Sequence, residues 1–170
     1  MNKKELQFLN FMSKQKKLEA VRENGHSIKY IDNPSEEVQL GAVSRDGHSI
    51  KYIKNPSERV QIEAVRDNGY SIKYIDNPSE KVQLEAVRMI GTAIKHIKNP
   101  SEYIKSIIDV IETSRRCIYV LHEPNKEPLF TIGCQRHITK ETFIRRIHEE
   151  DGGLKRNPHR QEYLDILNRY

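Results

Sequence analysis

The stretch NPSEKVQLEAVR at residues 77–88 decides the fold, because close copies of it recur along most of the chain. Its first four residues, Asn-Pro-Ser-Glu, also begin at Asn33, Asn55 and Asn99, so that successive copies are 22 residues apart. A degenerate copy precedes them, since residues 18–22 read LEAVR. The sequence therefore contains four full units, residues 11–32, 33–54, 55–76 and 77–98, and a half unit that ends near residue 113.

Each unit predicts two short helices. Asn33 can cap the first helix, Pro34 suits its first position, and Glu36 stands where a capping-box carboxylate belongs. Gly47 is expected to end that helix, and a shorter helix follows from His48. Two short helices cannot bury their apolar faces alone, so the units must stack into an α-solenoid with a thin, continuous core. A thin core agrees with a hydrophobic share of 36% and a charged share of 31%.

A glutamine recurs within the wide apolar arc of the first helix, at Gln39, Gln61 and Gln83. The width of this arc suits a helix that is packed on several sides. An amide that is repeatedly buried needs a hydrogen-bond partner. We therefore expect each amide to bond a neighbouring backbone group and to serve the scaffold.

The second helix of each unit presents a repeated surface. In the second unit Ile50 and Ile53 point inward, so Lys51 and Tyr52 point outward. Stacking places equivalent residues about 8–10 Å apart, which predicts one candidate partner-binding surface: Lys29, Tyr30, Lys51, Tyr52, Lys73, Tyr74, Lys95 and His96. Lysine beside tyrosine suits a protein interface and also suits nucleic acid. A structural role, with solvated lysines and with tyrosines lying over the next unit, is the third interpretation.

The location of the charge favours a protein partner over nucleic acid. The chain has 29 Lys and Arg against 24 Asp and Glu, a net charge of +5. Residues 11–113, however, hold 16 basic and 15 acidic side chains. A solenoid that follows phosphates should carry its excess charge on the repeats. Nucleic acid is therefore the alternative partner, and pairing with a second copy of the chain stays open.

The second unit departs from its neighbours at Gly41 and Ser44. The third unit has Glu63 and Arg66 at these positions, and this spacing predicts an ion pair within one helix. Glycine inside a helix costs about 1 kcal/mol relative to alanine. Gly41 and Ser44 either mark the close approach of a partner or reflect drift, and we include them among the candidate partner-binding residues.

Residues 114–170 leave the 22-residue pattern and predict a small ββαα module. Residues 117–121 and 129–132 predict two strands joined by a turn. A helix of about residues 140–150 follows, and a last helix begins after the Asn-Pro pair at 157–158. Residues 1–10 are expected to cap the other end of the array. The predicted organisation is a cap (1–10), an array (11–113) and a C-terminal module (114–170).

Two cysteines lie equally far from the centre of the predicted turn, so Cys117 and Cys134 would face each other in a symmetric hairpin. They are buried apolar residues, or a disulfide in an oxidising compartment, or zinc ligands together with His137 and either His122 or His148. The Cys134-x-x-His137 spacing resembles a ligand pair, but no second tight pair exists. We therefore expect no bound metal.

Several classes of protein are not expected. No apolar run approaches the roughly 20 residues of a membrane span, the first residues do not resemble a signal peptide, and two cysteines favour a reducing, cytoplasmic compartment. The sequence has no P-loop, no dinucleotide-binding glycine motif, no Gly-x-Ser-x-Gly and no His-Glu-x-x-His. His26 and His48 share a repeat position with Tyr70 and Thr92, which argues against a catalytic base there. We expect a non-enzymatic protein without a cofactor.

The unit NPSEKVQLEAVR, followed by GYSIKYI as at residues 69–75, resembles the short HEAT-like helical repeats of phage and bacterial proteins. The resemblance covers about residues 11–113. The segment from residue 133 to Tyr163 looks like a small hairpin-helix module that also occurs in phage proteins. The resemblance implies a helical array and a phage or prophage context. By analogy, it implies a protein that binds and blocks host machinery, including defence complexes.

Overall fold

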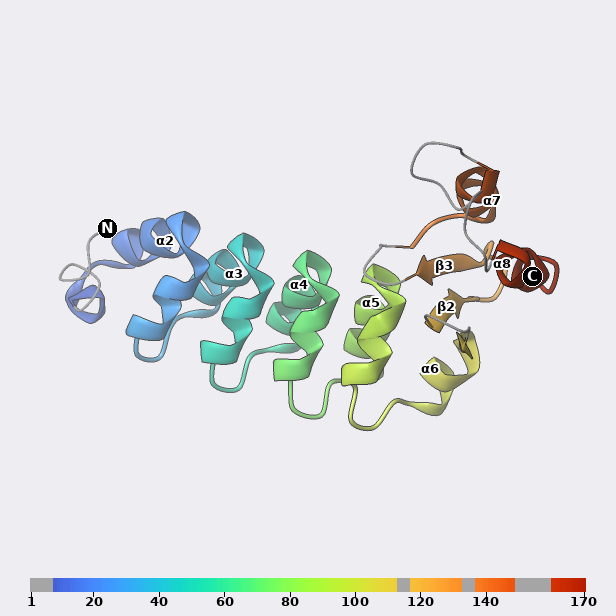
Figure 1. Cartoon of the computed structure of the whole chain (residues 1–170). Coiled ribbons are helices and arrows are strands. Elements are labelled where there is room, and N and C mark those ends of the chain that lie inside the picture. The colour runs from blue at the N-terminus through green and yellow to red at the C-terminus, as the bar shows by residue number, and fades with distance from the viewer. Residues whose placement is uncertain (1–7, 113–116, 133–136, 149–159) are drawn as a thin grey trace. The chain divides into compact units, whose positions relative to one another are not determined.

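A computed structural model describes residues 8–112, 117–132, 137–148 and 160–170 (Figure 1). The chain divides into two compact units. The first contains Met1–Met89 and Ala93–Pro100, and the second contains Ile90–Thr92 and Ser101–Tyr170.

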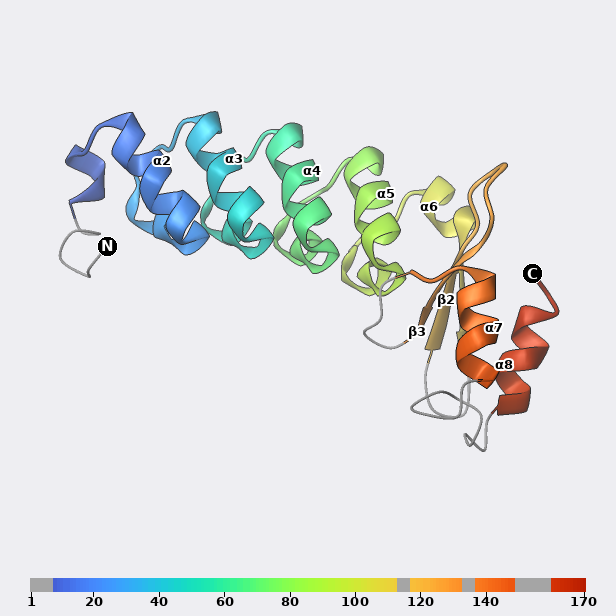
Figure 2. The same cartoon turned by 90° about the horizontal axis from the view of Figure 1, so that it is seen from above.

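In the repeats, 10-residue α-helices alternate with 6-residue 3-10 helices. The α-helices are α2 (Lys14–Glu23), α3 (Glu36–Arg45), α4 (Glu58–Asp67) and α5 (Glu80–Met89). The 3-10 helices are η2 (Gly25–Tyr30), η3 (Gly47–Tyr52), η4 (Gly69–Tyr74) and η5 (Gly91–His96), and a short helix η1 (Leu9–Phe11) precedes them. Figures 1 and 2 show α2 to α5 side by side in one row. The predicted helical-repeat array is confirmed.

The α-helices begin two residues later than predicted, because serine caps them and asparagine does not. Ser57 accepts a hydrogen bond from the backbone N–H of Val60, and α4 begins at Glu58. Asn55 has a φ of 50°, in the left-handed region that asparagine tolerates better than most residues. Glu36 is not part of a capping box, since its Oε1 accepts a 2.6 Å hydrogen bond from Ser57 Oγ of the next repeat. The Asn-Pro-Ser-Glu motif is a turn that links adjacent repeats.

The recurring glutamines bond backbone groups, as predicted. The Nε2 atoms of Gln39, Gln61 and Gln83 donate to the carbonyl oxygens five residues earlier, at 2.8, 2.9 and 3.0 Å. Those carbonyls belong to the prolines of the Asn-Pro-Ser-Glu turns. Each amide therefore ties the first turn of its own α-helix to the loop before it.

The tight winding of the 3-10 helices determines which residues face outward. In a 3-10 helix, residues three apart lie on the same side. Ile50 and Ile53 are accordingly only 1% and 7% exposed. Lys51 and Tyr52, between them at the end of η3, are exposed. The predicted inward and outward positions of the second helix are confirmed.

Gly47 permits close contact between repeats, and it does not end α3 as predicted. Asp46 lies between the two helices, and Gly47 opens η3. A Cβ atom on Gly47 would lie 2.3 Å from the carbonyl oxygen of Ala64 and 2.9 Å from Oγ of Ser71, both in the next repeat. The glycine is required because the next repeat's backbone occupies the space of a side chain.

The second compact unit contains α6 (Glu102–Ile107), β1 (Ile108–Glu112), β2 (Cys117–Leu121), β3 (Leu129–Ile132), α7 (Lys140–His148) and α8 (Arg160–Leu167). Within the described residues, the strands form an antiparallel sheet in the order β1-β2-β3. The core of this unit combines residues of β2, β3, α7 and α8: Ile118, Val120, Phe130, Ile132, Phe143, Tyr163, Ile166 and Leu167. The small C-terminal module is confirmed, with one strand more than predicted.

Two details of the sheet differ from the sequence prediction. The half unit was expected to stay helical to about residue 113, but α6 ends at Ile107 and β1 follows. Alternating β-branched residues favour a strand there, and Val110 is 46% exposed between less exposed neighbours. The register pairs Ile118 with Ile132, whereas the symmetric hairpin requires residue 133 opposite Ile118. A shift of one residue moves side chains to opposite faces of a strand.

Replacing Gly47 with alanine is expected to destabilise the array by about 1–3 kcal/mol, because the methyl group meets a backbone carbonyl that cannot move alone. Gly41→Ala is the matched control. Its Cβ would meet only the Val21 and Leu18 side chains, at 3.3 and 3.6 Å, and alanine favours a helix. Equilibrium denaturation followed by circular dichroism measures both. Equal stability of the two variants would contradict the role given to Gly47.

The C-terminal tyrosine predicts a loss of stability at high pH. Tyr170 donates a 2.5 Å hydrogen bond to Oδ2 of Asp109, and burial first, then this hydrogen bond, raises the pKa of Tyr170 to about 12. The folded chain thus holds the phenol proton more tightly than the unfolded chain. Wild type should lose stability relative to Tyr170→Phe as the pH rises from about 10 to 12. Denaturation curves at several pH values measure the difference, and a difference that does not change with pH contradicts the assignment.

Candidate partner-binding surface

The eight residues of the repeated surface end the 3-10 helices η2 to η5, and we call this set the Lys–Tyr face: Lys29, Tyr30, Lys51, Tyr52, Lys73, Tyr74, Lys95 and His96. Its four lysines are exposed. Tyr52 and Tyr74 are each 36% exposed, and Tyr30 is half-buried. The 3-10 geometry that buries the isoleucines thus brings these side chains to one side of the array.

Lysine and tyrosine are in contact along the face. The ammonium nitrogens of Lys29, Lys51 and Lys73 lie 4.7, 4.8 and 4.8 Å from the ring centroid of the tyrosine that follows each of them. Lys51 Nζ also lies 5.9 Å from the ring of Tyr74 in the next repeat. These are cation–π distances. One ammonium therefore spans the step from one repeat to the next.

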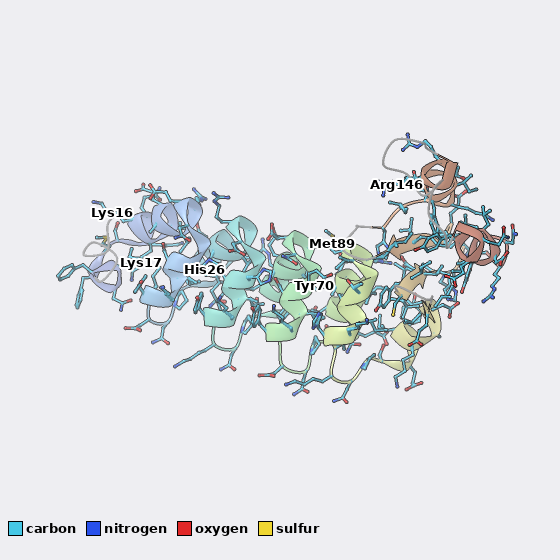
Figure 3. The ribbon with its side chains drawn as sticks, viewed as in Figure 1. Lys16, Lys17, His26, Tyr70, Met89 and Arg146 are labelled. Carbon is cyan, nitrogen blue, oxygen red and sulfur yellow. The ribbon has the colours of Figure 1, made fainter. Side chains whose placement is uncertain are left out.

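A second ring packs against the edge of the face in each repeat. His26 pairs with Tyr52 and His48 with Tyr74, at centroid distances of 5.5 and 5.7 Å. In the next step the residue types are exchanged, since Tyr70 pairs with His96 at 5.5 Å. All three are T-shaped contacts, a favourable geometry for aromatic rings. Figure 3 labels His26 and Tyr70, which occupy equivalent positions in their repeats.

These ring pairs were not found by sequence reasoning, which considered the position of His26 and His48 only as a catalytic base. A signal was present in the sequence. His48 is followed 26 residues later by Tyr74, and Tyr70 is followed 26 residues later by His96. A reciprocal exchange at constant spacing indicates that the two positions are in contact.

Polar groups beside the rings determine where the histidine protons lie. Asp46 Oδ2 lies 3.1 Å from His26 Nδ1, and a carboxylate only accepts, so this nitrogen carries a proton. Asn68 accepts the N–H of Tyr70 through Oδ1, which turns its Nδ2 toward Nδ1 of His48, 3.2 Å away. His48 Nδ1 must therefore accept. Equivalent histidines in adjacent repeats hold their protons on different nitrogens.

Four lysines on this side of the array have no carboxylate partner within the described residues: Lys29, Lys51, Lys54 and Lys73. Nearby charges are matched, since Lys98 Nζ lies 3.3 Å from Oδ1 of Asp76. The Lys–Tyr face therefore presents uncompensated positive charge, although the repeats as a whole are almost neutral.

A hollow opens beside the Lys–Tyr face between consecutive turns. It has a volume of about 650 Å³, and Ile53, Pro56, Gln61 and Tyr74 are among its lining residues. One repeat further on, a smaller hollow of about 160 Å³ is lined by the equivalent residues Ile75, Pro78, Gln83 and His96. The hollow is therefore part of the repeat.

Gly41 and Ser44 belong to a different surface. They line a hollow of about 400 Å³ together with Arg22, Glu37 and Leu40, and no lining residue belongs to the Lys–Tyr face. A Cβ on Gly41 would lie 3.3 Å from Cγ2 of Val21 in α2. The close approach at Gly41 is thus made by the preceding helix. The structure does not bring Gly41 and Ser44 together with the Lys–Tyr face.

The outer faces of the α-helices bond mainly to each other. Ser44 Oγ donates to Glu63 at 2.8 Å, and Arg66 Nε donates to Glu85 at 2.9 Å, in each case in the next repeat. The hydrogen bond from Arg66 lowers the pKa of the Glu85 carboxyl below its ordinary value. Sequence reasoning predicted pairs within one helix, and only Arg88 with Glu85 follows that pattern here. These contacts join adjacent repeats.

The proposed cysteine and zinc residues are only partly described. Cys117 is half-buried in β2, and His137 Nδ1 lies 2.7 Å from Oγ1 of the buried Thr131. His122 Nε2 lies 3.3 Å from Oδ2 of Asp109. Cys134 and the side chain of His148 lie outside the described residues. Within the described part of the chain, no group of three or more His, Cys, Asp or Glu side chains is placed to hold a metal ion.

Comparisons with protein-family models, with curated proteins and with solved structures find no match to this chain. Among the described helices, none combines the length and the apolar character that crossing a membrane requires.

The tautomer assignment predicts the effect of a single substitution. In Asn68→Asp the carboxylate accepts at both oxygens, so His48 should move its proton to Nδ1 and match His26. Imidazole ¹⁵N chemical shifts distinguish the two tautomers of a neutral ring. His26 is the internal control and should not change. If His48 keeps its proton on Nε2 in the variant, the assignment is wrong.

Proposed function

We propose that this protein is a non-enzymatic helical-repeat protein that binds a protein partner through the Lys–Tyr face. One observation carries the proposal: lysines without carboxylate partners recur at the end of successive 3-10 helices, each over an aromatic ring. Tyrosine is enriched in protein interfaces, and lysine is depleted in their buried cores but suits a charged rim. A rigid array holds both at regular intervals.

The contacts within the face favour protein over nucleic acid. Proteins that bind single strands stack bases on open aromatic rings. The rings of Tyr52 and Tyr74 already carry a lysine on a face and a histidine against an edge. Carboxylates such as Asp46 and Asp76 also lie beside the surface and would repel phosphates. Nucleic acid is therefore the alternative, and the experiment below distinguishes it.

The finer proposal is that the partner is a host complex, for example a defence complex, which a phage-encoded protein of this kind would block in the host cytoplasm. Its support is the resemblance of the repeats to phage and bacterial helical repeats. The small number of cysteines supports the reducing compartment. Both statements extend the proposal and do not alter the surface that is tested.

Affinity capture from a nuclease-treated bacterial lysate tests the proposal. Tyr52→Ala/Tyr74→Ala should reduce capture of the partner about tenfold or more, since a buried interface tyrosine commonly contributes over 1 kcal/mol. Phe11→Ala/Tyr103→Ala is the matched control, because it removes two exposed aromatic rings, 87% and 36% exposed, that do not belong to the face. The control should capture the same proteins as wild type.

Three results would count against the proposal. Wild type captures nothing above the level of an empty resin, or both double variants capture equally well. Alternatively, nuclease treatment removes every captured protein, which would favour nucleic acid as the direct ligand.

A further inference from the structure

We propose that the Lys–Tyr face binds an acidic segment of its partner in the polyproline II conformation, with an acidic side chain at every third residue. This inference rests on the proposed function and names the chemistry of the bound segment. It follows from the charge of the face, from the distance between repeats and from the shape of the hollow beside it.

Charge gives the sign of the ligand. Lys29, Lys51 and Lys73 form no ion pair within the described residues, and each ammonium is held over a tyrosine ring at 4.7–4.8 Å. Contact with a ring positions the ammonium but leaves its charge uncompensated. A carboxylate that arrives at each repeat would supply the missing partner.

The distance between repeats selects the conformation. Equivalent residues of stacked helices lie about 8–10 Å apart. In polyproline II, every third residue faces the same side, about 9 Å further along. An extended strand repeats its face about every 7 Å, and an α-helix about every 5.4 Å. Among these three regular conformations, only polyproline II places one acidic side chain at each lysine without a cumulative mismatch.

The hollow beside the face suits such a segment. Pro56 and Tyr74 line a volume of about 650 Å³, and aromatic-lined grooves are the usual docking site of proline-rich segments. Gln61 donates through Nε2 to the carbonyl of Pro56. Its Oε1 receives no hydrogen bond from the described residues, so it can accept from a bound backbone. Polyproline II has no internal hydrogen bonds and leaves its backbone groups available.

Fluorescence anisotropy with two labelled peptides of identical composition tests the inference. One peptide repeats Glu-Pro-Pro six times, and the other repeats Glu-Glu-Pro-Pro-Pro-Pro three times. Both carry six glutamates, but only the first has one on the same side at every third residue. The first should bind roughly tenfold more tightly, because the second can engage only alternate repeats from one face.

Charge-reversal variants locate the binding site. The triple variant Lys29→Glu/Lys51→Glu/Lys73→Glu should weaken binding of the first peptide about tenfold or more. Lys16→Glu/Arg59→Glu/Lys81→Glu makes the same change of charge on exposed positions of the α-helices, outside the Lys–Tyr face, and should bind within about twofold of wild type. Circular dichroism confirms that both variants keep their helices.

The outcomes separate this inference from the proposed function. Equal affinity for the two peptides, or equal loss in the two triple variants, overturns the polyproline II inference. Tighter binding of an oligothymidylate than of either peptide overturns it in favour of nucleic acid. If neither peptide binds while capture from lysate still depends on Tyr52 and Tyr74, the inference fails and the proposed function stands. If capture shows no dependence on those tyrosines, the proposed function fails independently.

Discussion

Each repeat is held against the next at a point where there is no room for a side chain. Gly47 opens its 3-10 helix directly against the carbonyl of Ala64 in the following repeat. A six-residue segment can bury its isoleucines at that distance only if it is wound tightly, and tight winding leaves the following lysine and tyrosine outside. The candidate binding surface is therefore a consequence of how the repeats pack.

A large part of this fold could be predicted from the sequence. The 22-residue period established the array, and the alternation of isoleucine with lysine and tyrosine established which side is exposed. The glutamine hydrogen bonds followed from the requirement that a buried amide be satisfied. These features are local, and they are repeated, so each copy supports the interpretation of the others.

What the sequence did not predict depends on contacts between segments. Asparagine and serine both cap helices, and only the geometry of the turn shows that Asn55 is left-handed while Ser57 caps. The strand β1 forms because β2 offers a partner that lies beyond the half repeat. On the candidate surface, the lysines and tyrosines were predicted, but the histidine–tyrosine pairs join different repeats and become visible only when helix is placed beside helix.

The contacts between repeats are copies of one another. The serine that donates to a glutamate of the preceding repeat does so at Ser57 and again at Ser79, at 2.6 Å in both cases. A gene duplication that inserts one whole unit would therefore create no unfamiliar interface, since the new unit meets its neighbours through contacts already present. Such an array can change its length in a single genetic event and keep its fold, and each added unit would extend the surface by one lysine and one ring.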